Sequence, residues 1–460
     1  MKIQLYDKSK IEWDHLTFSN MDLRRLIIPL MIEQFLNSLM GMADTMMVSR
    51  AGEAAISAVS LVDAVNILIT QVFTALATGG TIICAQYIGR QDKKESIRAA
   101  RQVVWTVFVI SMAISIICVA FRRPLLALIF GKVEKAVMTN SITYMWITAC
   151  SFPFIALFQA GAAFFQASGD SRFPMTVSVI SNIINIVGNA ILIFGFHMGV
   201  AGAGLATILS QAISALLVLY FLSRSNECYK LTVRKIRFHS DILRHIIKIG
   251  LPAGIQSSMF CISNIIIQST INTFGTDTMA AWTAYGKIDS VFWMLMSAFG
   301  ISITTFVGQN FGCGKLDRVK KSVRISLVMA LGSSMLLSAI LLLLGQYIFL
   351  LFTDDGNVLE LGVHILRTLV PFYATYVLVE VLSVAIRGTG ESLRPMLISG
   401  FGICVLRIVW ITCFLGADSQ LNMVLYSYPI SWAFTSLLFL IYYLRGNWLK
   451  KRIYETSLSL

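Results

Sequence analysis

Twelve long apolar stretches limit what this chain can fold into. A helix needs roughly 20 apolar residues to cross a hydrocarbon layer about 30 Å thick. The runs are continuously apolar and do not alternate with polar residues, which argues against a membrane-spanning strand barrel. The sequence therefore predicts an all-α integral membrane protein with transmembrane helices at 24–48, 55–85, 102–121, 136–163, 174–196, 202–223, 249–273, 279–309, 323–352, 364–386, 395–415 and 425–445.

Charged side chains are too few to cover a water-soluble globule and are unevenly distributed. Only 13% of the 460 residues are charged, whereas soluble domains carry about 25%. Of the 37 Lys and Arg residues, 29 fall in segments on one side of the predicted membrane and six on the other. This positive-inside bias predicts a multi-pass protein of the plasma (inner) membrane with cytoplasmic termini. The net charge of +13 is thus a topology signal and not a nucleic-acid-binding surface. Four of the six outer charges lie in one connection, 122–135, which fits the scheme poorly.

The two halves of the sequence follow one plan. Near the end of each half, "FFQASGDSRFPM" (164–175) matches "AIRGTGESLRPM" (385–396) at a shift of 221 residues. Near the start of each half, an ungapped shift of 223 residues pairs Pro29 with Pro252, Gly52 with Gly275, Ala75 with Ala298, Thr81 with Thr304, Gln86 with Gln309, Gly89 with Gly312, and Arg101 with Arg324.

This repeat predicts a two-lobe architecture. Both halves contain six spans and enter the membrane in the same sense, as in transporters built from parallel repeats, whose halves rock to give alternating access. A duplication retained only for packing is the alternative interpretation. We expect a cytoplasmic N-terminal segment (1–23), a six-helix lobe (24–223), a basic linker (224–248), a second six-helix lobe (249–445) and a cytoplasmic tail (446–460).

One carboxylate in the first span, Asp44, is a candidate for ion coupling. It lies fifteen residues after Pro29, which removes one backbone hydrogen bond and can act as a hinge. A carboxyl group surrounded by hydrocarbon favours a neutral state, so it can bind a proton or a hard cation. Either event removes a buried negative charge and changes the relative energy of two conformations.

A polar cluster in the fifth and sixth spans has chemistry that complements this carboxylate. Asn182, Asn185 and Asn189 share one helix face, and Thr207 follows the glycine-rich "GVAGAGLAT". Asparagines that bind neighbouring helices, with glycines that permit close packing, are the alternative role. Oxygens from Asp44, Asn185, Asn189 and Thr207 would also suit Na⁺, which is the one metal ion that we expect.

The other ionisable residues inside spans are Glu33, Asp63, Lys287, Asp289, Glu380 and Arg407. Such residues usually face a partner helix or a water-filled cavity. For Glu33 and Asp63 a structural contact and a functional role are equally good interpretations. For Lys287 and Asp289 we favour a structural contact.

The chain resembles the multidrug and toxic compound extrusion (MATE) family of transporters over nearly its whole length. The resemblance is carried by "IPLMIEQFLNSLMGMADTMMVSRAGEAAISAVS", "AQYIGRQD", "MGVAGAGLATILSQ" and the two repeated loops. It implies a V-shaped pair of six-helix lobes that export organic compounds in exchange for H⁺ or Na⁺. It is closest to the subgroup with its coupling carboxylate in the first helix, matched by Asp44. The matching polar residues are Asn185, Asn189 and Thr207, with Tyr144 near the pocket.

The sequence departs from that subgroup at Asn189, where relatives often carry a second aspartate. The pocket then contains one carboxylate where those relatives have two, so both H⁺ and Na⁺ remain candidates for the coupling ion. The acid of the seventh helix in another subgroup has no match, since Met259 and Phe260 occupy that region. Glu380, which the repeat pairs with Gln159, is a secondary candidate for binding a cationic substrate. The substrate-binding candidates are thus Tyr144, Gln159, Met259, Phe260 and Glu380.

The leading hypothesis is a secondary active exporter of small amphipathic cationic compounds, acting as a monomer in the lipid bilayer. Its partners would be drugs and toxic organic compounds, with no nucleic acid and no cofactor beyond H⁺ or Na⁺. The alternatives are a flippase for lipid-linked oligosaccharides, which tends to need more basic residues in its cleft, and an integral-membrane transferase. The chain has no phosphate-binding loop of the G-x-x-x-x-G-K-[ST] type, and its histidines lack metal-ligand spacing. We therefore expect a transporter and not an enzyme.

Overall fold

The computed structural model describes residues 20–50, 52–131, 134–224, 239–414, 421–445 and 448–449, and every regular element in these ranges is a helix. Twelve helical segments are long and apolar enough to cross a membrane, which confirms the predicted fold class. They are Arg24–Val48, Glu53–Gly89, Lys93–Ala120, Lys135–Ala167, Arg172–Gly195, Gly199–Arg224, Ser240–Phe274, Thr276–Gly312, Leu316–Phe349, Gly356–Gly388, Leu393–Cys413 and Leu421–Leu444.

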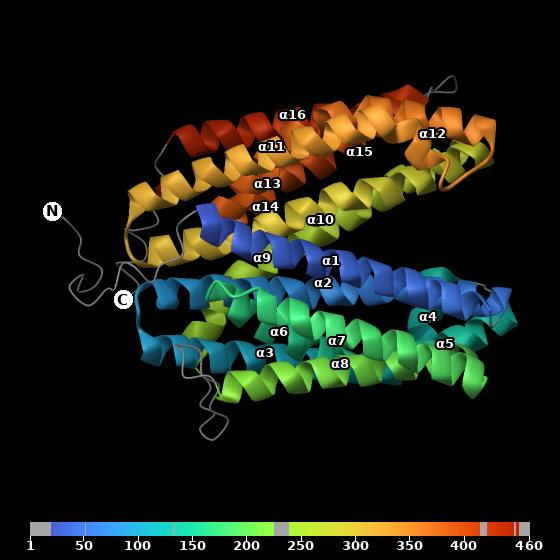
Figure 1. The fold of residues 1–460 in the computed structure, drawn as a ribbon, viewed down its shortest axis with the longest axis horizontal. Coiled ribbons are helices and arrows are strands. Elements are labelled where there is room, and N and C mark those ends of the chain that lie inside the picture. The colour runs from blue at the N-terminus through green and yellow to red at the C-terminus, as the bar shows by residue number, and fades with distance from the viewer. Residues whose placement is uncertain are drawn as a thin grey trace. The chain divides into compact units, whose positions relative to one another are not determined.

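The chain divides into two compact units, of which Met21–Gly254 forms the N-terminal one. In this unit α6 packs against α2, α3 and α8, and α7 packs against α8 (Figure 1). Buried aliphatic and aromatic side chains fill the interior. The rings of Phe73 and Phe152 pack edge to face, with their centroids 6.0 Å apart. Its helices are α1 (Asn20–Ser49), α2 (Glu53–Gly89), α3 (Lys93–Ala120), α4 (Arg122–Phe130), α5 (Lys135–Ala149), α6 (Phe152–Ala167), α7 (Arg172–Asn189), η3 (Ala190–Gly195), α8 (Gly199–Arg224) and the first half of α9 (Ser240–Ile271).

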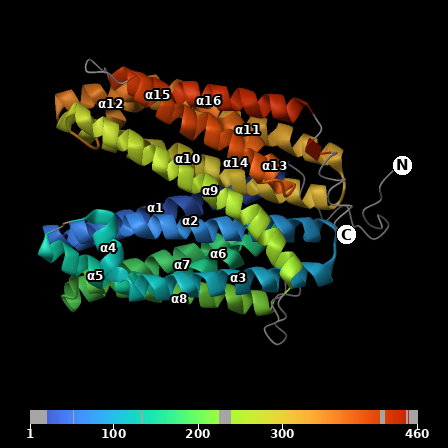
Figure 2. The same cartoon turned by 180° about the vertical axis from the view of Figure 1, so that it is seen from behind.

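The second unit contains the described residues from Ile255 onward. Here α13 packs against α10, α11 and α16 (Figure 2). The helices are the remainder of α9, η4 (Asn272–Phe274), α10 (Thr276–Gly312), α11 (Leu316–Phe349), α12 (Gly356–Leu369), η5 (Val370–Phe372), α13 (Tyr373–Gly388), α14 (Leu393–Ser399), η6 (Gly400–Val405), α15 (Leu406–Phe414) and α16 (Leu421–Leu444).

Helix α9 contributes to both units, because the division falls between Gly254 and Ile255. Its first half lies against α2, where two glycines allow backbone-to-backbone contact. A Cβ atom on Gly79 would lie 2.9 Å from the Ile246 carbonyl oxygen, and one on Gly250 would lie 3.0 Å from the Ala75 carbonyl oxygen. Only glycine fits this seam without displacing a helix.

Matching backbone geometry shows that the internal repeat is structural. Helices α2 and α10 each contain 37 residues. Gly52 and Gly275, which precede them, have φ of +110° and +101°, and Gly169 and Gly390 have φ of +91° and +89°. These positive angles favour glycine, so the paired glycines are retained for the same turns.

The fourth and tenth spans are both interrupted. Helix α5 ends at Ala149 and α6 begins at Phe152, with Pro153 in its first turn. In the second unit α12 ends at Leu369, and a short 3₁₀ segment containing Pro371 leads into α13. Proline is tolerated in a first turn but cannot continue a preceding helix, so each span consists of two segments.

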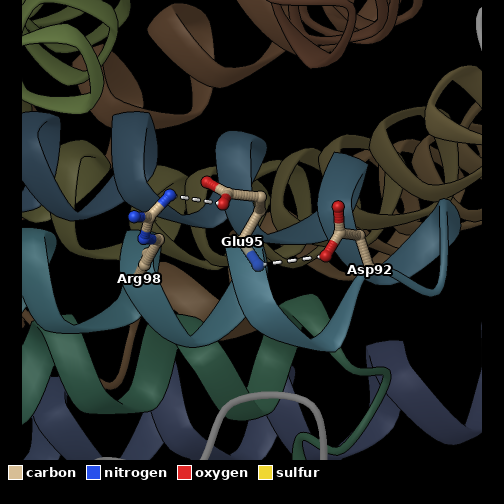
Figure 3. Close-up of polar contacts among 3 residues, drawn as sticks. All are labelled: Asp92, Glu95 and Arg98. Atoms are coloured by element: carbon tan, nitrogen blue, oxygen red, sulfur yellow. Dashed lines mark hydrogen bonds and ion pairs between the residues drawn. The ribbon is translucent and has the colours of Figure 1, made fainter.

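The "AQYIGRQD" motif forms the joint between α2 and α3. Asp92 caps α3 by accepting a hydrogen bond from the Glu95 amide at 3.1 Å, and Glu95 pairs with Arg98 at 2.6 Å (Figure 3). Gln91 adopts φ of +56° in the turn. The motif is therefore accounted for by helix capping at a tight turn.

The basic connection at 122–135 contains the short helix α4, which packs against α3 and α5. Arg122 donates to the Val119 carbonyl at 2.7 Å, while Arg123 and Leu128 are exposed. A short helix with exposed basic and apolar side chains is typical of a membrane–water interface.

Candidate functional site

Helices α1 and α7 contact each other with a constant offset in residue number, and these contacts position the residues of the site. Ser171 donates to the Leu26 carbonyl at 2.8 Å, Ser178 donates to Glu33 at 3.4 Å, and Asn189 donates to Asp44. The partners are 145 residues apart in all three bonds. The two helices are therefore parallel and make polar contacts from Leu26 to Asp44.

Asp44 stands at one end of a chain of hydrogen bonds that joins three helices. The Asn189 amide nitrogen donates to Asp44 Oδ1 and to Asn185 Oδ1, the latter at 3.2 Å. Asn185 in turn donates to Thr207 Oγ1 on α8 at 3.4 Å. The structure thus brings the four residues predicted for ion coupling together; their role in coupling remains a prediction.

Small residues on α7 and α8 allow this close arrangement. A Cβ atom on Gly188 would lie 3.1 Å from Ala206 Cβ, and one on Gly204 would lie 2.7 Å from Ile147 on α5. Directly after Asn189 the helix widens into the π-helical segment η3. Such widened turns occur frequently at functional sites, and this one begins beside the amide that contacts Asp44.

The hydrogen-bond chain leaves oxygen atoms that can accept a cation. Asn189 Oδ1 is buried and has no hydrogen-bond partner among the described residues, although buried polar atoms are usually paired. Carboxylate, amide and hydroxyl oxygens are hard ligands. A proton on Asp44 and a Na⁺ ion among these oxygens both suit this set of donors.

A second carboxylate, Asp63 on α2, extends the site. Tyr144 on α5 donates to Asp63 Oδ1 at 3.4 Å, and Asn66 donates to the same oxygen at 3.3 Å. Tyr144 also packs against α8, where a Cβ atom on Gly204, three residues before Thr207, would lie 3.6 Å from its ring. The sequence left the role of Asp63 open. The i, i+3 spacing of Asp63 and Asn66 was a local signal for a polar site.

The other predicted substrate contacts do not join this hydrogen-bond chain. Gln159 accepts from Thr74 at 3.1 Å, about three helical turns along α2 from Asp63. In the second unit Glu380 accepts from Tyr376 at 3.3 Å. Phe260 is half-buried, and the Met259 methyl lies 2.6 Å from the position of a Cβ on Gly400.

The second unit has its own half-buried carboxylate, Asp289, which contacts several aromatic side chains. Tyr285 donates to it at 3.2 Å and Trp293 at 2.6 Å, and Tyr373 of α13 also donates. Lys287 is exposed, so the two residues face different surroundings. The structure confirms an interhelical contact for Asp289, and the tyrosine and tryptophan four residues to either side gave a local signal for its aromatic contacts.

Arg407 is the other intramembrane charge that the sequence singled out. Its guanidinium donates to Ser431 at 3.1 Å and lies 4.0 Å from the centroid of the Tyr428 ring. A cation–π contact of this kind stabilises a buried guanidinium. Within the described ranges, no group of three or more His, Cys, Asp and Glu side chains is arranged to hold a metal ion.

Comparison with known proteins places the chain among membrane transporters. The MatE family model matches residues 29–191 and 252–412. The probable multidrug resistance protein NorM of Thermotoga maritima is 26% identical, with 94% of each chain covered. The FAD transporter of Shewanella oneidensis is 24% identical, covering 69% of this chain and 71% of that protein. These names confirm the expectation of a transporter rather than an enzyme.

The fold is shared with a solved structure. The outward-facing conformation of a multidrug resistance MATE family transporter of the MOP superfamily gives a TM-score of 0.87 at 22% identity. The match covers 94% of this chain and 96% of that chain. At this identity the likeness establishes the fold alone.

Proposed function

This chain belongs to the MatE family, and from that premise we propose that it is a secondary active multidrug efflux antiporter. It exports small amphipathic cationic compounds in exchange for H⁺ or Na⁺ by alternating access. We place it in the plasma (inner) membrane as a monomer with cytoplasmic termini. The uneven distribution of Lys and Arg supports this orientation.

The observation that carries the proposal is the hydrogen-bond chain that starts at Asp44. A carboxylate within an apolar span is unfavourable unless it has a partner. Here the partner is an amide that also binds Asn185, so a change at Asp44 is passed to α7 and, through Thr207, to α8. Binding a cation at Asp44 therefore alters contacts on three helices at once.

Coupling follows if the cation-bound and cation-free forms of Asp44 favour different conformations. Neutralising the carboxylate weakens the charge-assisted bond from Asn189. A ligand shifts a conformational equilibrium only by its difference in affinity for the two states. Occupation of Asp44 would supply such a difference, and Pro29 lies on the same helix as the proposed hinge.

A transport experiment tests the proposal. Purified protein is reconstituted into liposomes with a pH gradient or a Na⁺ gradient imposed separately, and ethidium movement is followed by fluorescence. We expect one gradient to drive ethidium movement and Asp44→Asn to abolish it. Asp354→Asn, at an exposed position between α11 and α12, is the matched control and should transport normally.

Two further arms define the substrate class. FAD, suggested by the name of one relative, is an anionic probe, and cation transport without FAD transport supports the cationic class. A fluorescent lipid-linked sugar tests the flippase alternative. Ethidium movement that ignores both gradients, or persists in Asp44→Asn, would overturn the proposed antiport.

A further inference from the structure

We propose that Asp63, with Tyr144 and Asn66, forms a second position for a monovalent cation, so that each transport cycle exchanges two cations for one substrate molecule. The inference rests on the proposed function and assigns a stoichiometry to the same site. The second cation is a proton or Na⁺, whichever the first position accepts.

The geometry of Asp63 parallels that of Asp44. Each carboxylate is half-buried and accepts a hydrogen bond from an asparagine amide nitrogen: Asn189 for Asp44 and Asn66 for Asp63. In each case the oxygen of that asparagine is buried and has no partner among the described residues. An unpaired buried acceptor is unfavourable. When the carboxylate binds a cation, a half-turn of the asparagine amide would bring this oxygen to the protonated carboxyl group or to the Na⁺ ion.

Tyr144 links the two positions. Its side chain is buried and its hydroxyl donates to Asp63. Its ring packs against α8, because a Cβ atom on Gly204, three residues before Thr207, would lie 3.6 Å from the ring. The titratable groups that act on Asp63 from neighbouring helices are thus Asp44 of α1 and Tyr144 of α5.

Burial in a low-dielectric pocket favours filling both positions, although repulsion between the two carboxylates makes the first cation bind more tightly than the second. Two carboxylates that interact in a low-dielectric site do not lose or gain protons independently. With one position filled, the remaining carboxylate stays a buried negative charge beside an oriented hydroxyl. With both filled, the pocket is neutral, and a neutral pocket is the form in which the surrounding helices rearrange at least electrostatic cost.

The charge moved per cycle tests the inference. Exchange of two monovalent cations for one ethidium cation moves one net charge inward, whereas one-for-one exchange moves none. Proteoliposomes loaded with ethidium receive an inside-negative K⁺ diffusion potential from valinomycin, in addition to the driving gradient. We expect the potential to accelerate wild-type efflux and to leave Asp63→Asn efflux unchanged, above a protein-free liposome control.

The steady state gives a second readout. The ethidium gradient should vary with the square of the cation gradient in the wild type and with its first power in Asp63→Asn. Tyr144→Phe, which keeps the ring but removes the hydroxyl that orients Asp63, should lie between the two. Parallel arms with H⁺ alone and Na⁺ alone identify the second cation.

Failure of this inference differs from failure of the proposed function. Wild-type transport that is gradient-driven but insensitive to potential would overturn the two-cation exchange and leave antiport intact. An Asp63→Asn protein that elutes normally on size exclusion and remains potential-sensitive would do the same. Wild-type transport that depends on neither gradient would remove the premise itself.

Discussion

Asp44 and Asp289 are both carboxylates within membrane-spanning helices, but they differ in their hydrogen-bond partners. Asp289 accepts from two tyrosines and a tryptophan, so its negative charge is well solvated by fixed donors. Asp44 accepts from a single amide that is shared with Asn185. We therefore regard Asp289 as a packing element of the second unit and Asp44 as the exchangeable site.

Substitutions along the hydrogen-bond chain should have graded effects. Removing a bond to a charged group weakens binding by about 1.5–3 kcal/mol, and removing a neutral bond by about 0.5–1.5 kcal/mol. Asn189→Leu should therefore raise the half-maximal cation concentration for export more than Thr207→Val, whose hydroxyl bonds Asn185 and not Asp44. Cation titration of proteoliposome transport measures both, and an equal effect of the two would contradict this order.

At the residue scale the sequence predicted part of the site. The spacing of Asn185 and Asn189 on one helix face and the position of Asp44 were readable, and the structure joins them. The contact between Asp63 and Tyr144 was not, because the two residues lie 81 positions apart and the sequence does not say which face of α2 meets α5. Contacts across helices need the tertiary arrangement that periodicity alone does not supply.

At the scale of helices, close approach is set by small residues. In the second unit η6 lies so close to α16 that a Cβ atom on Gly402 would collide with the Thr435 side chain. A π-helical segment places its residues differently from an ordinary helix, so this contact was not evident in the sequence. The twelve spans themselves were predictable, because apolar length depends on the local sequence alone.

Gly402→Ala should destabilise the protein by about 1–3 kcal/mol, the usual effect of overpacking a tight contact. Gly332→Ala on α11 is the matched control, since a Cβ atom there meets nothing within 4 Å. Thermal unfolding of the purified protein in detergent, followed by intrinsic fluorescence, compares the two. A midpoint for Gly402→Ala equal to that of Gly332→Ala would show that η6 and α16 are less tightly packed.

At the scale of the whole molecule, the sequence predicted two six-span halves but not how contacts divide them. The long basic segment after α8 suggested a boundary before 249, whereas the contacts separate only after Gly254. The reason is the glycine seam between α2 and α9, which depends on Ala75 and Gly79 far back in the chain. The basic composition of a segment shows that it is a connection. It does not show which helices the next helix packs against.

The membrane orientation gives a whole-molecule prediction. Glu53→Cys should react with a membrane-impermeant maleimide in intact cells, and Lys94→Cys only after permeabilisation, because these exposed positions lie at opposite ends of spans. The wild-type protein gives the background, because native Cys150 and Cys413 are exposed. Cys313 adds little to it, since burial raises the pKa of its thiol to about 12 and thiolate is the reactive form. Labelling of Lys94→Cys in intact cells, above the wild-type signal, would reverse the assignment.

The shared helix α9 also bears on biosynthesis. Since Ile246 and Gly250 complete the packing of α2, the N-terminal unit is unfinished when its sixth span leaves the ribosome. Seven spans, and not six, must be inserted before Ala75 and Gly79 are covered. In a nascent chain halted at residue 224, the surface of α2 around Ala75 and Gly79 would be uncovered. In a nascent chain extended past residue 254, the first half of α9 would cover it.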